Sequence, residues 1–134
     1  MKKLIVSMLF FSVLSWAGEN AQRVKEMKIF SAAVELIQKG ILYNCKDCID
    51  DGADRVLKNI KLLEEIKDVK EFLPKEQKYA YKFAQKTAKL IEMYAKDLKD
   101  QAVDPKNINM QDVINDYSQI IVQCTSCHMR VRGW

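Results

Sequence analysis

The chain has 134 residues, with 22 Lys or Arg against 18 Asp or Glu, and its formal net charge of +4 is mildly basic. The lysines alternate with acidic residues instead of forming a patch, which is not the charge pattern of a nucleic-acid-binding protein. Glycine and proline are scarce, with four and two residues. No stretch alternates apolar and polar residues with a period of two, whereas helical periodicity is present, so we expect an all-α protein.

Residues 1–17 have the three parts of a secretory signal peptide. Lys2 and Lys3 form a positively charged start, an apolar run follows from Leu4 to Leu14, and SWA at 15–17 is a small-x-small cleavage site. The run is shorter than the roughly twenty apolar residues that span a membrane. We therefore expect cleavage, export to the periplasm and no membrane attachment afterwards; a permanent N-terminal anchor is the alternative.

Two helices are predicted in the first half of the remaining domain, residues 18–134. The first runs from about Asn20 to Tyr43, and after the loop NCKDCIDDG the second begins at a cap formed by Asp50 or Asp51. Their buried stripes are expected to contain Met27, Phe30, Val34, Ile37 and Ile41 in the first helix, and Val56, Leu57, Ile60 and Leu63 in the second.

Two more helices are predicted in the second half. Pro74 opens the third, residues 100–109 form a linker, and Asn109 begins the fourth, with Asp112 three residues later. Their buried stripes are expected to contain Tyr79, Phe83, Leu90, Tyr94 and Leu98, and then Val113, Tyr117, Ile120 and Ile121. Four amphipathic helices with mostly short connections predict an antiparallel four-helix bundle, because each helix needs a neighbour to cover its apolar stripe.

The predicted fourth helix runs into a C-x-x-C-H motif formed by Cys124, Cys127 and His128. At about 100° per residue, these side chains share one arc of the helix with Tyr117 and Ile120. Two thiols one turn apart can form thioethers with the two vinyl groups of haem while the adjacent imidazole reaches the iron. For this geometric reason the motif is the attachment signature of c-type haem. We expect one covalently attached haem c, with His128 as the proximal iron ligand.

Three other roles for these cysteines agree with fewer features of the sequence. A thioredoxin-like redox pair requires a βαβ setting, and no strand is predicted. A zinc site formed by Cys45, Cys48, Cys124 and Cys127 has suitable ligand types, but two long helices separate the pairs. A disulfide within the motif leaves His128, the one histidine of the chain, without a role. An exported bundle without haem, stabilised by disulfide or zinc cysteines, is therefore the alternative class of protein.

The other cysteine pair lies in the first interhelical loop. Cys45-x-x-Cys48 is followed by Ile49, where a haem motif requires histidine. Asp47 and two further aspartates crowd the pair, and their negative charge argues against a reactive thiolate. We expect a structural disulfide between Cys45 and Cys48, with a redox-sensing switch, metal ligation or an unusual attachment as alternatives.

A single histidine excludes bis-histidine ligation within one chain, and six residues follow His128, so the sixth iron ligand comes from upstream or is absent. In this layout the chain resembles the class II c-type cytochromes, the cytochrome c′ family. Members are exported four-helix bundles with C-x-x-C-H on the last helix. Val131 and Arg132 match the apolar and basic residues that follow the family motif. Arg23 and Met27 match the spacing of an arginine and a distal-face residue on the first helix.

The resemblance implies further roles. Arg23 would contact a haem propionate and Arg132 would pack beside the proximal imidazole. In the low-spin branch of the family a first-helix methionine is the sixth ligand, which makes Met27 the expected distal ligand and the protein an electron carrier, not an enzyme. In the high-spin branch the distal face is open and binds NO or CO, which is the alternative function.

Two patterns concern partners, which we expect to be periplasmic redox proteins. The first helix carries a second apolar stripe, which predicts a homodimer through the first helices because a monomeric bundle needs one stripe per helix. Its members are Ile29, Ala32, Ala33, Leu36, Gly40 and Tyr43. The third helix carries a run of lysines that either steers an acidic partner or is a solvated face. These are Lys82, Lys86, Lys89, Lys96 and Lys99.

Overall fold

The computed structural model describes residues 2–64, 66–103 and 108–132, and the side chains of residues 21, 23–64, 69–102 and 108–131. Over these residues the protein is helical and contains no strand, so the all-α prediction is confirmed. The elements are α1 (Lys2–Tyr43), α2 (Lys46–Ile60), the 3-10 helix η1 (Lys61–Leu63), α3 (Ile66–Phe72), the 3-10 helix η2 (Lys75–Ala80), α4 (Tyr81–Val103) and α5 (Met110–Arg132).

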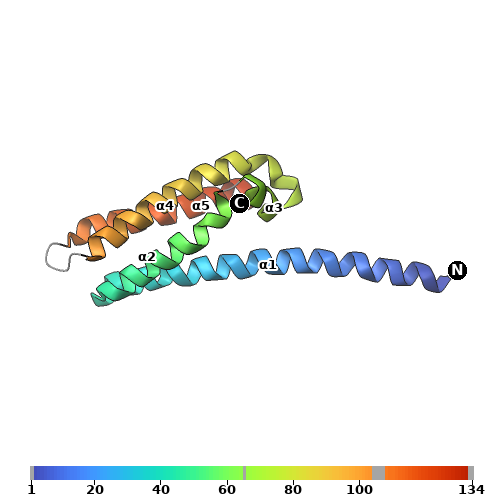
Figure 1. Ribbon diagram of the computed structural model, residues 1–134, viewed down its shortest axis with the longest axis horizontal. Helices are drawn as coiled ribbons and strands as arrows, with labels where there is room; N and C mark the ends of the chain where they lie inside the picture. Colours follow the sequence, from blue (N-terminus) through green and yellow to red (C-terminus); the bar gives the residue numbers. More distant parts are fainter. Residues whose placement is uncertain (1, 65, 104–107, 133–134) are drawn as a thin grey trace.

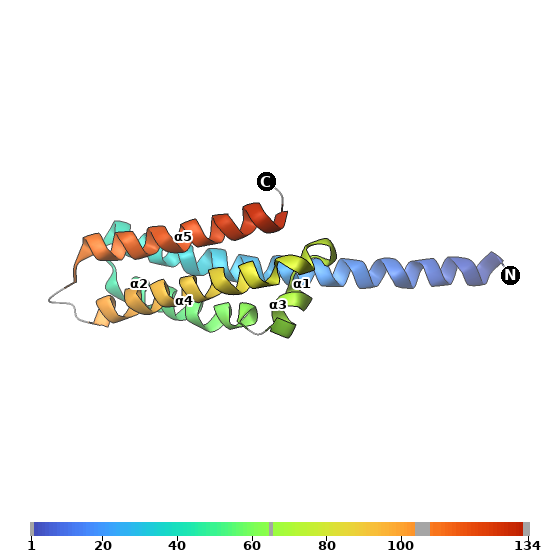
Figure 2. The same ribbon diagram turned by 90° about the horizontal axis from the view of Figure 1, so that it is seen from above.

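The long helices α1, α2, α4 and α5 pack along one another, and successive ones run in opposite directions (Figures 1 and 2). Helix α2 contacts α1 and α4, and α5 contacts α4 and, over a smaller area, α1. The short elements η1, α3 and η2 connect α2 to α4 and lie away from the turn between α1 and α2 (Figure 1). This arrangement leaves α1 and α5 in close contact over only part of their lengths.

Helix α1 begins earlier than predicted and ends where predicted. It is continuous from Lys2, and its first part extends beyond the other helices (Figure 2). Its C-terminal end is closed by Asn44, whose φ of 54° is left-handed, and by a hydrogen bond of 2.9 Å from the Cys45 N–H to the Gly40 carbonyl oxygen. Asparagine tolerates this conformation, and the bond is that of a Schellman motif. In the described residues, we find no helical stretch with the length and hydropathy needed to cross a membrane.

Helix α2 begins directly after this turn, so the prediction of a cap at Asp50 or Asp51 is wrong. The N-cap is Cys45, whose Sγ accepts a hydrogen bond of 3.3 Å from the Cys48 N–H. Both aspartates lie inside the helix, where Asp51 pairs with Arg55 at 2.7 Å. The left-handed Asn44 turns the chain at once, and therefore the residues expected to form a loop form the first turn of α2.

Two glycines allow α1 and α2 to approach closely. A Cβ atom at Gly40 would lie 2.5 Å from Ile49 Cγ1, and a Cβ atom at Gly52 would lie 2.6 Å from Ile37 Cγ1. Around them the fully buried side chains of the interface are Ala33, Ile37, Ile49, Ala53 and Val56. Two members of the second apolar stripe predicted for α1, Ala33 and Gly40, are therefore buried against α2 instead of being available to a second subunit.

Helix α4 buries a different face from the predicted one. Tyr79 in η2 is 68% exposed and Phe83 is 37% exposed, although both were expected in the core. The buried face of α4 contains Ile91, Leu98 and four alanines, and Ala80 at the end of η2 continues it. The four alanines are Ala84, Ala88, Ala95 and Ala102. Alanine faces allow helices to pack closely, and the larger residues are displaced to the rim. Leu98 is buried as predicted.

The boundaries of the last two long helices agree with the sequence in part. Pro74 is the N-cap of η2, and α4 begins only at Tyr81. Residues 100–103, expected in a linker, belong to α4, and residues 104–107 of that linker lie outside the described residues. Asn109 precedes α5 as predicted, and its Oδ1 accepts a hydrogen bond of 3.0 Å from the Gln111 N–H. Val113 and Ile120 are buried in α5, whereas Ile121 is 36% exposed.

Candidate cofactor site

A cavity of about 460 Å³ lies among α1, the α2–η1 segment, α3, α4 and α5. Ligand pockets in proteins typically have volumes of about 300–1,000 Å³ and mostly apolar linings. Here the lining is apolar apart from a few side chains, of which Arg23 and His128 are the ones that can carry a positive charge. The cavity has the size and character of a site for a large, mainly apolar cofactor.

Helix α5 presents the cysteine–histidine motif to this cavity. Cys124, Cys127 and His128 all line it, together with Val131 one turn later. The three side chains share a face because residues three and four apart are neighbours on a helix. Each is partly buried. The structure thus brings the two thiols and the imidazole together in one apolar space, as their spacing predicts.

Helix α1 supplies the residues that the resemblance singled out. Arg23 and Met27, one helical turn apart, line the same cavity as the α5 motif. Phe30 and Val34 continue this wall toward the middle of α1. Residues near the two ends of the sequence therefore meet at one site. The side chain of Arg132 lies outside the described residues, and its backbone ends α5.

Burial changes the protonation of the site. Burial, with a smaller contribution from the nearby Cys127, raises the pKa of Cys124 to about 11. An ordinary cysteine has a pKa of about 8.5, and a nucleophilic cysteine has a lower one. Cys124 is therefore a protonated thiol at neutral pH. Neither it nor Cys127 forms a disulfide in the structure.

Several lining residues were not predicted from the sequence. Thr87 in α4 is buried, and its hydroxyl donates a hydrogen bond of 2.9 Å to the Phe83 carbonyl oxygen. In the sequence, Thr87 lies three residues after Ala84 and directly before Ala88. This helical spacing could have indicated that Thr87 shares the alanine face. Phe72, Leu73 and Pro74, at the end of α3 and just after it, also line the cavity. This segment is too short to show a periodic pattern, so sequence reasoning missed it.

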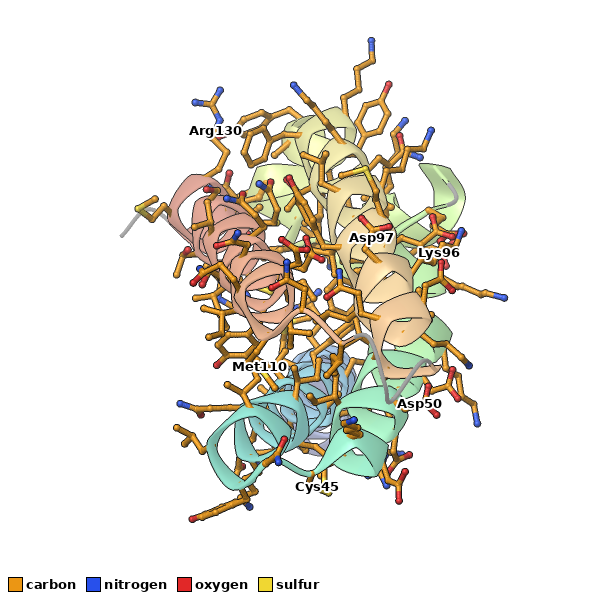
Figure 3. The ribbon with its side chains drawn as sticks, turned by 90° about the vertical axis from the view of Figure 1, so that its left-hand side faces the viewer. Cys45, Asp50, Lys96, Asp97, Met110 and Arg130 are labelled. Atoms are coloured by element: carbon orange, nitrogen blue, oxygen red, sulfur yellow. A yellow bond between two sulfur atoms is a disulfide. The ribbon has the colours of Figure 1, made fainter. Side chains whose placement is uncertain are left out.

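The other cysteine pair is separate from the cavity. Cys45 and Cys48 are joined by a disulfide, with their Cα atoms 5.3 Å apart, at the turn between α1 and α2. Figure 3 shows Cys45 at this turn, away from α4 and α5. The structure does not assemble the four-cysteine zinc site considered above. Among the residues that the structure describes, no cluster of three or more His, Cys, Asp or Glu is arranged to hold a metal ion.

Comparisons of the chain with protein-family models, with curated protein sequences and with solved structures find no match.

Proposed function

We propose that this protein is an exported haem c protein that carries single electrons between periplasmic redox partners. In this proposal α1, α2, α4 and α5 form an antiparallel four-helix bundle of the cytochrome c′ type. The observation that carries it is the shared cavity: the C-x-x-C-H motif of α5 faces an apolar space of about 460 Å³ that α1 closes with Arg23 and Met27. The predicted signal peptide, residues 1–17, supports export.

The donor set fits one haem c. Cys124 and Cys127 supply thiols one turn apart for two thioether bonds, and His128 supplies the proximal imidazole. Met27 of α1 lines the same cavity and is the proposed distal ligand, because thioether ligation of haem iron suits an electron carrier. Arg23 also lines the cavity, and its guanidinium would bind a haem propionate.

The chain's own residues explain why electron transfer is favoured over substrate chemistry. When bound, haem c supplies a one-electron couple. The apolar lining excludes water, and a thioether at the distal position leaves no site for a substrate. We therefore propose an electron carrier and not an enzyme.

A second candidate function is the binding of NO or CO at an open distal face. It is favoured by the apolar wall that continues from Met27 through Phe30 and Val34, both of which line the cavity. A small uncharged gas would be accommodated against such a wall if Met27 does not bind the iron. The third candidate, an exported helical protein without haem, is supported by the disulfide alone.

One experiment separates these functions: the visible absorption of the reduced full-length protein, with and without CO, after expression in a host that attaches haem c. We expect a low-spin spectrum that CO does not change. Met27→Leu, which keeps the side-chain volume, should open the iron to CO. Met93→Leu is the matched control, because Met93 is exposed on α4 and does not line the cavity. A high-spin, CO-sensitive spectrum of the unmodified protein supports the gas binder, and a colourless protein refutes both haem functions.

A further inference from the structure

Lysines without partners occupy one face of η2 and the first half of α4. Lys78, Lys82, Lys86 and Lys89 are all exposed and follow one another at steps of three and four residues. We call these four residues the basic face. Within the described part of the chain, none of them forms an ion pair. The sequence between Glu76 and Glu92 contains no acidic residue, so this segment departs from the alternation of charges seen elsewhere.

Three lysines outside the basic face form ion pairs. Lys96 binds Glu92 at 2.6 Å, Lys99 binds Asp54, and Lys39 on α1 binds Glu35 at 2.7 Å. Such pairs between residues four apart are usual on a solvated helix surface. The basic face lacks them, and its positive charge is therefore not compensated locally.

Charge is distributed unevenly along α4: the half of the helix that lines the cavity is basic, and the other half is acidic. The first half of the helix lines the cavity with Ala84, Thr87, Ala88 and Ile91 on the side opposite to the lysines. At the other end, aspartates from α4 and α5 surround a second hollow of about 380 Å³: Asp97, Asp100, Asp112 and Asp116. Figure 3, which looks along the helices from that end, shows Asp97 on α4. The cavity thus lies in the basic half of the α4–α5 pair.

Two exposed aromatic side chains are interleaved with the lysines. Tyr79 follows Lys78, and Phe83 follows Lys82, and both rings are accessible to solvent. Aromatic side chains within a polar rim are typical of the centre of a protein–protein interface. This combination gives the basic face both an apolar contact and an electrostatic one.

We propose that the basic face binds an acidic surface on a partner protein. The aspartates at the other end of α4 and α5 repel that surface, so the end of the molecule that contains the cavity meets the partner first. The inference rests on the proposed function in one respect, namely that the partner is a redox protein. Complementary charge raises association rates and orients the encounter, while like charges disfavour the reverse orientation. The four lysines span about 17 Å of helix at 1.5 Å per residue, a length suited to one side of a small protein interface.

The test compares two variants of the full chain with equal loss of charge. Lys82→Gln/Lys86→Gln/Lys89→Gln removes three positive charges from the basic face. Lys39→Gln/Lys96→Gln/Lys99→Gln removes three paired ones elsewhere. The probe is fluorescent poly-L-glutamate, with binding followed by anisotropy at low and at physiological salt. Carbodiimide cross-linking and mass spectrometry then locate the contacted lysines. Phosphatidylglycerol vesicles are tested in parallel.

We expect the first variant to bind poly-L-glutamate roughly five- to fiftyfold more weakly than the unmodified chain, since exposed pairs contribute modestly and are screened by salt. The second variant should stay within about twofold. Cross-links should map to Lys78, Lys82, Lys86 or Lys89. Any one of three results would overturn the proposal. These are equal losses of binding in both variants, cross-links concentrated at Lys39, Lys96 or Lys99, and binding to the vesicles without binding to poly-L-glutamate.

These measurements do not depend on haem. A colourless protein that still binds the probe through the basic face would refute the proposed function and retain the docking surface. A haem-containing protein whose two variants behave alike would refute the docking surface alone.

Discussion

A side chain at position 52 would separate α1 from α2. In the variant Gly52→Ala, the new Cβ atom would lie 2.6 Å from Ile37 Cγ1, 2.9 Å from the Ile37 backbone nitrogen and 3.0 Å from the Ala33 carbonyl oxygen. The first contact can be relieved by a change of rotamer. The other two involve backbone atoms of α1, which can move away only if the whole helix shifts.

Two opposing terms set the magnitude. Replacing glycine by alanine inside a helix stabilises it by about 1 kcal/mol. Overpacking a tight interior costs about 1–3 kcal/mol, and contacts with backbone favour the upper half of that range. We therefore expect Gly52→Ala to lower the free energy of unfolding by about 1–2 kcal/mol. For a domain of this size, that lowers Tm by roughly 4–8 °C.

The assay is thermal and urea unfolding followed by far-UV circular dichroism. Lys58→Ala is the control, because Lys58 is exposed on the same helix and such surface changes stay within about 0.5 kcal/mol. If Gly52→Ala is as stable as the unmodified protein, or more stable, the two helices do not approach as described and the reasoning fails.

Three further predictions concern the cysteines and a surface ion pair. Replacing Cys45 and Cys48 by serine should lower the free energy of unfolding by only about 2 kcal/mol, because the disulfide closes a very short loop; urea titration measures this, and a much larger loss would contradict it. In protein prepared without haem, the raised pKa of Cys124 means that the folded state favours the thiol. The free energy of unfolding should therefore be independent of this group below about pH 8 and should fall as pH rises from about 8.5 toward 11, and Cys124→Ala should make that fall smaller in urea titrations between pH 7 and 11. Asp51→Asn, which breaks the exposed pair with Arg55, should lower the urea midpoint only slightly, and in 1 M salt that difference should nearly vanish; a salt-independent loss would contradict it.

Features with a local cause could be predicted from the sequence. Asn109 caps α5 through its own side chain, and this cap is visible in the residues themselves. The common orientation of Cys124, Cys127 and His128 follows from helix geometry alone. These predictions needed no knowledge of what the helices pack against.

Features that depend on packing between helices could not be predicted in the same way. The buried face of α4 was placed on large residues such as Tyr79, whereas close packing selected alanines such as Ala84 and Ala88. The start of α2 depends on the left-handed backbone conformation of Asn44. That conformation cannot be recognised from the residue types that usually cap helices. Periodicity placed Met27 on the buried stripe of the first helix, but its proposed role at the cofactor site came from a family resemblance.

The cavity takes its walls from α1 and from α5, which are separated by nearly the whole of the chain. As the chain folds, α1 and α2 can pair through their glycine contacts without α5. The pocket therefore closes late, when the ends of a long loop come together at an entropic penalty that grows slowly with loop length. A chain in which α5 has not yet docked would expose the apolar wall formed by Met27, Phe30 and Val34, and this makes it a candidate substrate for chaperones.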